Sequence, residues 1–336
     1  MKTTYTSMKT TLIICTYKRP EAILKLLLSV EKQTVYPDQI LVVDASQDTL
    51  TQTVCTQNNF ANLNYFHVSE EHKGLTKQRN FGVSKTAQNT EVIAFLDDDI
   101  VLDPDYFEKI LGVYARFPEA LGVGGYIKNG VEWKQGHAPT PDYFEYDGYY
   151  RKDGSRFLLR KKLGLAPDRP PAHLPDFSHG RSVSFLPPSG KIYEVEQFMG
   201  GVASYRKSVF DQIEFSTYFE GYGLYEDADF TLRLSKLGKL YVHTGAQVAH
   251  HHDASGRPDS FKYGKMVVRS GWYIWRVKYP DPSFKARFKW HATSFLLTLI
   301  RYSNALTDKD KKQALQEALG RTAGWFSLWF NKPAEI

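Results

Sequence analysis

The chain has 336 residues, of which 42% are apolar and 14% are aromatic, and its net charge is +6. A chain of this length and composition can bury a large core, and its aromatic content excludes an intrinsically disordered protein. Its two cysteines, Cys15 and Cys55, provide no disulfide framework and are typical of a reducing compartment.

Strand-like apolar runs alternate with helical patterns in the first third of the chain. The near-continuous Val, Ile and Leu content of the runs is typical of strands covered on both faces. This alternation predicts a mostly parallel sheet with helices packed on it, and ligands of such sheets bind beyond the carboxyl ends of the strands. The predicted strands are 12–15, 40–43, 63–67, 92–96 and 121–127, and the predicted helices are 21–32, 50–57, 75–87 and 105–116.

The turn after the first predicted strand and the start of the helix at 75–87 both carry cations. The turn presents backbone N–H groups and charge to an anionic or aromatic ligand. Lys77 and Arg79 could neutralise a diphosphate, or could form an ordinary solvated helix face. Asp44, at the end of the second strand, could accept hydrogen bonds from a base or ribose, or could cap a helix. The residues of the turn are Thr16, Tyr17, Lys18 and Arg19.

Three adjacent carboxylates, Asp97, Asp98 and Asp99, directly follow the predicted strand 92–96. Carboxylates at the end of a buried strand repel one another, so folding them there costs free energy unless a cation or a hydrogen-bonding ligand compensates. Hard oxygen ligands suit Mg2+ or Mn2+, and these ions usually share their remaining positions with substrate phosphates. The run predicts a metal-containing nucleotide-diphosphate site, and the structural alternative is a solvated turn.

Residues 128–197 are rich in Pro, Gly and Tyr and read as a long irregular insertion with short strands. Such a segment is either a functional lid or an irregular extra layer. After it we predict a strand at 197–204, which contains Gly200 and Gly201, a short helix at 206–213 and a helix at 228–237.

Two further polar clusters follow the insertion. Glu226 and Asp227 precede the predicted helix 228–237, as acids favoured at a helix N-terminus would, and either could be a general base. Asp229 and Arg233 stand four apart on that helix and are expected to pair structurally. The three histidines that end the apolar run near residue 249 are a source of metal ligands alongside carboxylate oxygens. These histidines are His250, His251 and His252.

The C-terminal segment 257–336 accounts for the net positive charge of the chain, with 15 Lys and Arg against 6 Asp and Glu, and it holds five of the six tryptophans. Cations interleaved with amphipathic aromatics suit a membrane interface with anionic lipid. A helical layer that packs its aromatics on the core explains the pattern equally well. No nucleic-acid-binding motif accompanies the charge. We expect no secretory signal, and the longest later apolar run, 295–300, is far too short to span a bilayer.

Taken in chain order, these motifs resemble those of bacterial family-two glycosyltransferases with a GT-A fold. The match runs from Thr11 to about Ser255 and is interrupted by residues 128–197. The resemblance implies an α/β fold with a Rossmann-like, mostly parallel sheet flanked by helices, an irregular insertion and a C-terminal helical tail. The implied domains are a glycosyltransferase domain at 1–256 and a basic, aromatic-rich helical region at 257–336.

The resemblance also implies a binding site for a nucleotide-sugar donor. The first turn looks like the opening nucleotide-site turn of the family, Asp44 like its base-recognition aspartate, and the segment with Lys77 and Arg79 like its basic helix start. The aspartate run resembles the DxD motif, whose first positions contact ribose. The residues assigned to the donor on these grounds are Thr16, Tyr17, Arg19, Asp44, Lys77, Arg79, Asp97, Asp98, Gly200 and Gly201.

The catalytic and metal-binding roles follow from the same resemblance. Glu226 and Asp227 resemble the ED motif, whose aspartate is the usual catalytic base, so Asp227 is favoured over Glu226. The last aspartate of the run, Asp99, coordinates Mn2+ or Mg2+ in the family. His250 matches a histidine sometimes contributed to the metal, and His252 remains a further candidate.

The implied activity is an inverting transfer of a sugar from a UDP or dTDP sugar to a glycan or lipid-linked acceptor, in bacterial surface polysaccharide synthesis. The alternatives are a metal-dependent nucleotidyltransferase or phosphohydrolase and a non-catalytic, glycan-binding scaffold. We expect a cytoplasmic protein, with peripheral contact to anionic lipid on the inner face of the cytoplasmic membrane, and no nucleic-acid partner.

Overall fold

The computed structural model describes residues 8–219, 222–251, 259–307 and 309–333, and it divides into two compact units. The first unit comprises residues 1–131 and 188–254, and the second comprises 132–187 and 255–336. The irregular insertion predicted at 128–197 therefore belongs largely to the same unit as the C-terminal tail. The sequence pattern assigned it to the first domain, and the domain assignment stays a prediction.

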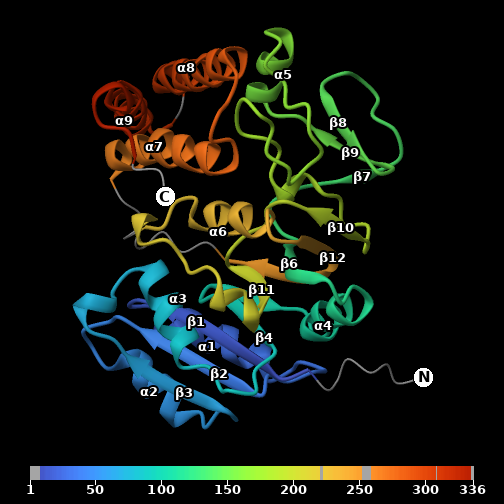
Figure 1. The fold of residues 1–336 in the computed structure, drawn as a ribbon, viewed down its shortest axis with the longest axis vertical. Coiled ribbons are helices and arrows are strands. Elements are labelled where there is room, and N and C mark those ends of the chain that lie inside the picture. The colour runs from blue at the N-terminus through green and yellow to red at the C-terminus, as the bar shows by residue number, and fades with distance from the viewer. Residues whose placement is uncertain (1–7, 220–221, 252–258, 308, 334–336) are drawn as a thin grey trace. The chain divides into compact units, whose positions relative to one another are not determined.

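A nine-stranded sheet forms the centre of the first unit (Figure 1). Six strands, β3, β2, β1, β4, β6 and β12, point the same way, whereas β11, β10 and β5 run opposite to their neighbours. The predicted α/β class with a mostly parallel sheet is thus confirmed. In spatial order the strands are β10 (Ile192–Val195), β12 (Lys239–His250), β6 (Ala120–Ile127), β11 (Val202–Arg206), β4 (Val92–Asp97), β1 (Thr10–Thr16), β2 (Gln39–Asp44) and β3 (Leu63–His67), and β5 (Ile100–Leu102) pairs with β12.

Helices flank this sheet and cover its apolar faces. Side chains from β1, β2 and β4, such as Leu12, Val42 and Leu96, are fully buried in one core with apolar side chains of α1 and α4. On the other face of these strands, Ile13, Leu41 and Phe95 are buried as well, so β1, β2 and β4 are covered on both faces, as predicted. The predicted strand 63–67 differs, because the residues of β3 are only partly buried or exposed. The helices of the first unit are α1 (Pro20–Val30), α2 (Leu50–Gln57), α3 (Leu75–Ser84), α4 (Tyr106–Arg116) and α6 (Glu226–Leu234).

The elements after residue 197 differ from their predicted bounds. The predicted strand 197–204 is β11 at Val202–Arg206, and the predicted helix 206–213 is a 3-10 helix at Lys207–Asp211. The backbone contact with β4 continues one residue before β11, because the carbonyl of Gly201 accepts the Asp97 N–H at 3.1 Å. α6 begins at Glu226, two residues before its predicted start, so that both acids lie in its first turn.

The second unit combines a small antiparallel sheet with a helical layer. Trp272, Trp275 and Trp290 are buried in its core beside Phe177, so three of the five tryptophans of the tail pack internally. Trp275 also donates its indole N–H to the carbonyl of Asp176 at 2.9 Å, which ties the helices to the irregular segment. Its elements are β7 (Lys134–Gln135), β8 (Tyr143–Tyr146), β9 (Tyr149–Lys152), α5 (Ser155–Lys162), α7 (Ser260–Lys278), α8 (Phe284–Thr307) and α9 (Lys311–Phe330).

Glycines allow α7 and α9 to approach closely. A Cβ placed at Gly320 of α9 would overlap the backbone carbonyl of Phe261 in α7, and one at Gly264 of α7 would overlap the carbonyl of Glu317 in α9. Backbone atoms cannot move aside as a flexible side chain can, so both positions require the absence of a Cβ.

In the described parts of the chain, the structure contains no helix with both the length and the apolar composition that crossing a bilayer requires.

We expect Gly320→Ala to lower the free energy of unfolding by about 1–3 kcal/mol, because the added methyl group forces α7 and α9 apart. The matched control is Gly112→Ala in α4, where the new Cβ would meet no atom within 4 Å and alanine improves helix propensity. Urea denaturation of the two variants measures the difference. Equal midpoints would show that close α7–α9 packing contributes nothing to stability.

Candidate active site

The three consecutive aspartates at the end of β4 have different partners. Asp98 is buried, and its two carboxylate oxygens accept hydrogen bonds from the Thr16 hydroxyl at 2.7 Å and from Arg19 at 3.0 Å. Burial raises the pKa of Asp98 to about 6 in spite of these donors. Asp98 therefore anchors the turn after β1 to the end of β4.

Asp99 points toward β12, where His250 is placed. The Asp99 carboxylate lies 2.8 Å from His250 Nε2, and this hydrogen bond raises the pKa of His250. Register explains the encounter, because His250 pairs with Ile100 of β5, next to Asp99 in the chain. The side-chain amide of Asn129 also bonds both the N–H and the carbonyl of His250, at 2.8 and 2.7 Å, which fixes the backbone of this histidine.

Asp97, Asp99 and His250 form a candidate metal centre. One ligand atom from each lies within 4.8 Å of the others. Two carboxylate oxygens and one imidazole nitrogen are a donor set that Mn2+ accepts readily and Mg2+ less so. The residues present therefore fit the predicted divalent ion. His251 is exposed, and the predicted ligand His252 lies outside the described residues.

Arg79 is buried between two carboxylates. Its guanidinium lies 2.5 Å from Glu226 of α6 and 3.6 Å from Asp97 of β4. Burial raises the pKa of Glu226 to about 8, and the positive charge of Arg79 opposes this shift. These contacts favour a role for Arg79 in positioning the two acids, and its predicted contact with a diphosphate stays a prediction.

Gly200 and Gly201 bring the backbone against the acidic residues. A Cβ at Gly201 would overlap the Asp97 carboxylate, and one at Gly200 would lie 2.6 Å from Glu226 Oε1. The Gly200 N–H donates to Asp227 at 3.3 Å, and the Ala228 N–H donates to the other oxygen of that carboxylate at 2.8 Å. Burial raises the pKa of Asp227. A carboxylate oriented by two backbone amides and with a raised pKa suits proton abstraction.

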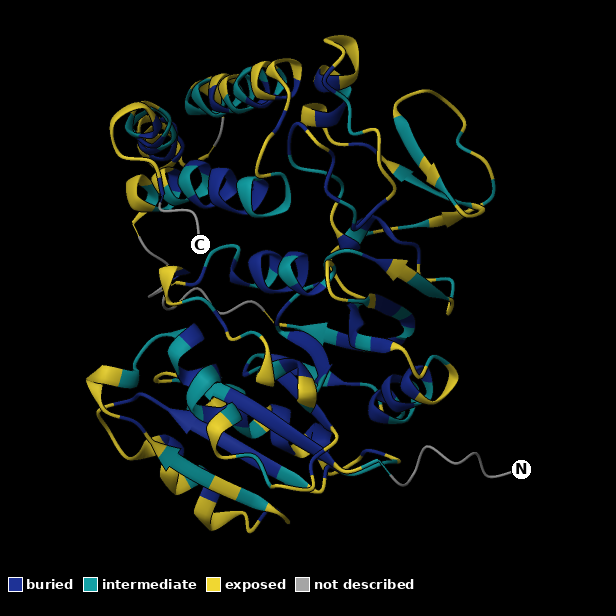
Figure 2. Cartoon of the chain, in the orientation of Figure 1, coloured by how far each residue is buried: buried dark blue, intermediate teal, exposed yellow. Residues whose placement is uncertain are grey.

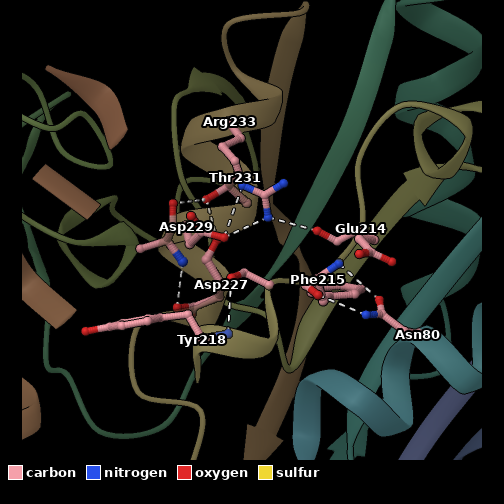
Figure 3. A network of polar contacts seen from close by, with 10 residues as sticks. Asn80, Glu214, Phe215, Tyr218, Asp227, Asp229, Thr231 and Arg233 are labelled. Atoms are coloured by element: carbon pink, nitrogen blue, oxygen red, sulfur yellow. Dashed lines mark hydrogen bonds and ion pairs between the residues drawn. The ribbon is translucent and has the colours of Figure 1, made fainter. Parts of the chain in front are cut away.

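A polar network holds the first turns of α6 in place (Figure 3). Arg233 donates to Asp229 at 2.7 Å, which confirms the predicted pair within α6. Arg233 also donates to the carbonyl of Glu214 at 2.8 Å. Asn80 of α3 bonds both the N–H and the carbonyl of Phe215, at 3.0 and 2.8 Å. Residues 214 and 215 are thus tied both to α3 and to α6, the helix that carries Asp227.

The predicted nucleotide-binding residues lie around the first turn and β2. Asp44 is fully buried, and its oxygens accept hydrogen bonds from Ser46 and from the Tyr65 hydroxyl at 2.8 Å. Tyr17 is exposed, and the Lys18 and Lys73 ammonium groups lie 5.3 and 5.0 Å from its ring centroid. Lys77 is half-buried in the first turn of α3. The donor-site assignment of these residues stays a prediction.

Two residues that support the site carried no recognisable signal in the sequence. Asn129, which holds His250, lies in the Gly-rich start of the predicted insertion, 121 residues before its partner. Gln78 donates to the carbonyls of Thr16 and Val43, at 3.1 and 2.8 Å, and so joins the ends of β1 and β2.

Comparisons with known proteins point to one family. Residues 11–171 match the family model described as glycosyl transferase family 2. The chain is 28% identical over 148 residues to glucosyl-dolichyl phosphate glucuronosyltransferase of Haloferax volcanii, which covers 43% of this chain and 44% of that protein. It is 33% identical over 119 residues to O-antigen chain rhamnosyltransferase RfbN of Salmonella typhimurium, covering 35% of this chain and 37% of that protein. The chain thus spans less than half the length of these two curated relatives.

A solved structure, S. aureus TarS 1-349, shares the fold. It aligns with a TM-score of 0.52 at 18% identity, over 95% of this chain and 80% of that chain. A second structure of that protein, in complex with UDP, aligns with a TM-score of 0.50 at 18% identity, over 93% and 80% of the two chains. The expected GT-A-type fold is confirmed by this likeness.

We expect Mn2+ to stabilise the protein against heat and Asp99→Ala to abolish that stabilisation. A ligand at a hundredfold excess over its Kd adds about 2.7 kcal/mol, which thermal unfolding resolves. Because the pKa of His250 is raised, protons should displace the ion as the pH falls through that raised pKa. Asp211→Ala, at an exposed position on the 3-10 helix 207–211, is the control. Equal Mn2+ responses in both variants would exclude Asp99 as a ligand.

We expect Gly201→Ala to weaken Mn2+ stabilisation at least about tenfold in apparent Kd, because the new Cβ displaces the Asp97 carboxylate. Gly154→Ala is the control, since its Cβ would meet no atom within 4 Å. Calorimetric titration with Mn2+ measures the effect. An unchanged Kd in Gly201→Ala would mean that Asp97 is not a ligand.

Proposed function

The chain carries a glycosyltransferase family 2 domain over residues 11–171, and on this premise we propose that it transfers a sugar from a nucleoside-diphosphate sugar to an acceptor hydroxyl group. The observation that carries the proposal is the juxtaposition of two acidic groups. The candidate metal centre of Asp97, Asp99 and His250 is joined through Arg79 to the first turn of α6, which holds Asp227.

The donor would bind at the rim formed by the ends of β1, β2 and β4. A bound divalent ion would stabilise the negative charge that develops on the departing diphosphate. Arg19, 3.7 Å from Asp99, would add positive charge beside it. Tyr17 offers an exposed ring for stacking on the base. We propose UDP or dTDP as the nucleotide, and the UDP bound by the structurally similar TarS supports the first.

Asp227 would act as the general base of an inverting transfer. Its carboxylate takes the proton of the acceptor hydroxyl as that oxygen forms a bond to the anomeric carbon. On the opposite side of this carbon, the bond to the diphosphate oxygen breaks, and the leaving group keeps the electron pair. Glu226 is less suited to this role, because it is buried and its Oε1 is held by Arg79 at 2.5 Å.

The relatives suggest the kind of acceptor. One acts on a glucosyl-dolichyl phosphate and the other on an O-antigen chain, according to their names. We propose a glycan or lipid-linked acceptor in bacterial surface polysaccharide synthesis. The enzyme would then work in the cytoplasm, where it meets its nucleotide-sugar donor, at the inner face of the cytoplasmic membrane.

The first experiment is incubation of the protein with a panel of radiolabelled nucleotide sugars, Mn2+ and glycan or lipid-linked acceptors. Transfer of the label to an acceptor, with release of intact nucleoside diphosphate, is the expected result. Release of inorganic phosphate without labelled acceptor would identify a phosphohydrolase instead. Donor binding without any turnover would identify a non-catalytic binding protein.

We expect Asp227→Asn to lower the rate of transfer at least about a hundredfold while leaving donor binding intact, because it removes only the proton acceptor. Burial raises the pKa of Asp227, and the base must be ionised, so the rate should fall as the pH drops through that raised value. Single-turnover rates across pH and calorimetric donor titration separate the two effects. Near-normal turnover by Asp227→Asn would refute the assignment, and Asp211→Asn should behave as the parent.

A further inference from the structure

The outer side of α8 is lined by large apolar side chains. Phe284 is 86% exposed and Leu306 is 78% exposed, and three further exposed residues lie between them. The spacings of four and seven residues put all five on one stripe of the helix. The opposite side of α8 is buried through Trp290 and Thr293. The residues of the stripe are Phe284, Phe288, Phe295, Leu299 and Leu306.

α9 carries a second stripe, also at helical spacing. Phe330 is 91% exposed and Trp329 is 64% exposed at its C-terminal end, whereas Ala314, Ala318 and Leu328 face the interior. Figure 2 shows that exposed positions recur along both helices. The residues of this stripe are Leu315, Leu319, Phe326, Trp329 and Phe330.

Contacts between α8 and α9 bring the two stripes together. The exposed Trp329 of α9 stacks on His291 of α8, with ring centroids 6.2 Å apart. The Tyr302 and Thr322 hydroxyls are 3.0 Å apart, and Tyr302 stands seven residues after Phe295, on the same side of α8. The two helices therefore present one continuous surface, which we call the α8–α9 apolar face. An exposed apolar surface of this extent marks a site of association.

The charges within these two helices are mostly positive. α8 contains Lys285, Arg287, Lys289 and Arg301 and no Asp or Glu. α9 begins with Lys311 and Lys312, and its one acid is buried. That acid, Glu317, is neutralised by Arg301 at 2.7 Å and Arg321 at 2.8 Å. The acids nearest these helix starts are Asp281, before α8, and Asp310, which caps α9 by accepting the Gln313 N–H at 3.0 Å. The exposed cations Lys285, Arg287, Lys311 and Lys312 outnumber these two carboxylates, so the positive charge beside the apolar stripes is only partly offset.

We propose that the α8–α9 apolar face docks on the surface of an anionic lipid bilayer. Phe and Leu side chains of the stripes enter the boundary between headgroups and acyl chains, and the flanking lysines and Arg287 contact lipid phosphates. A second copy of the chain is a poorer occupant. A symmetric dimer places the same patch on both sides of the interface, so the cations of one copy would repel those of the other.

The proposal differs from an aromatic anchor built on the tryptophans of the tail. Trp272, Trp275 and Trp290 are buried in the core of the second unit and are unavailable to lipid. The docking residues are instead phenylalanines and leucines at helical spacing, with Trp329 at one end. This surface stands independently of the proposed transfer reaction, so vesicle binding and sugar transfer can fail separately.

Co-sedimentation of the full chain with vesicles tests the proposal. We expect binding to vesicles of phosphatidylcholine with about 30% phosphatidylglycerol, weaker binding to phosphatidylcholine alone, and loss of the difference at high salt. The double variant F295S/L299S should bind the anionic vesicles at least about tenfold more weakly, because two inserting side chains are lost. The double variant K285E/R287E should lose the preference for anionic lipid.

The matched control is L50S/L237S, which removes two exposed leucines from the first unit. It should bind vesicles as the parent does. Equal vesicle binding by the parent and F295S/L299S would overturn the proposal. So would a dimer of the parent, seen by light scattering, that F295S/L299S converts to a monomer without any effect of lipid. Circular dichroism and melting curves verify that every variant is folded.

Discussion

The buried guanidinium of Arg79 is the charge on which the candidate site depends. It stands between Asp97 and Glu226, which is 147 residues away in the chain, and its side chain is 3% exposed. Two carboxylates in this setting would repel each other and resist ionisation without a cation between them. Arg79 therefore couples α3, β4 and α6, because it contacts both a candidate metal ligand, Asp97, and the residue before the proposed base.

The aspartate run gains its different functions from the way the chain turns after β4. Asp97 faces Arg79, Asp98 faces the turn after β1, and Asp99 faces β12. Each carboxylate thus has a different counter-charge or hydrogen-bond donor, which offsets the repulsion among the three adjacent aspartates. Asp98 is engaged by Thr16 and Arg19, and its two neighbours are the carboxylates of the candidate metal centre.

The sequence predicted five of the six strands that point the same way, β1, β2, β3, β4 and β6, and the acidic residues at the end of β4, because local periodicity and adjacent charges carry those signals. It did not predict β12 as a strand, and the roles of Asp227 and His250 stay predictions that rest on the family resemblance. It did not predict the burial of Arg79, the clamp on His250 by Asn129 or the engagement of Asp44 by Tyr65. These depend on pairing between segments far apart in the chain, which no local pattern reports. It also left open whether the tryptophans of the tail are internal, because buried and interfacial aromatics have the same composition.

The glycines between α7 and α9 have a consequence for how the second unit folds. Each glycine inside a helix costs about 1 kcal/mol relative to alanine, and α9 carries Gly320 and Gly324 near its middle. In isolation this segment would form an unstable helix. It is stabilised only where the backbone of α7 packs against Gly320 and Gly324. Formation of α9 and its docking on α7 are therefore one cooperative event, so a chain that ends before α9 would lose order in α7 as well.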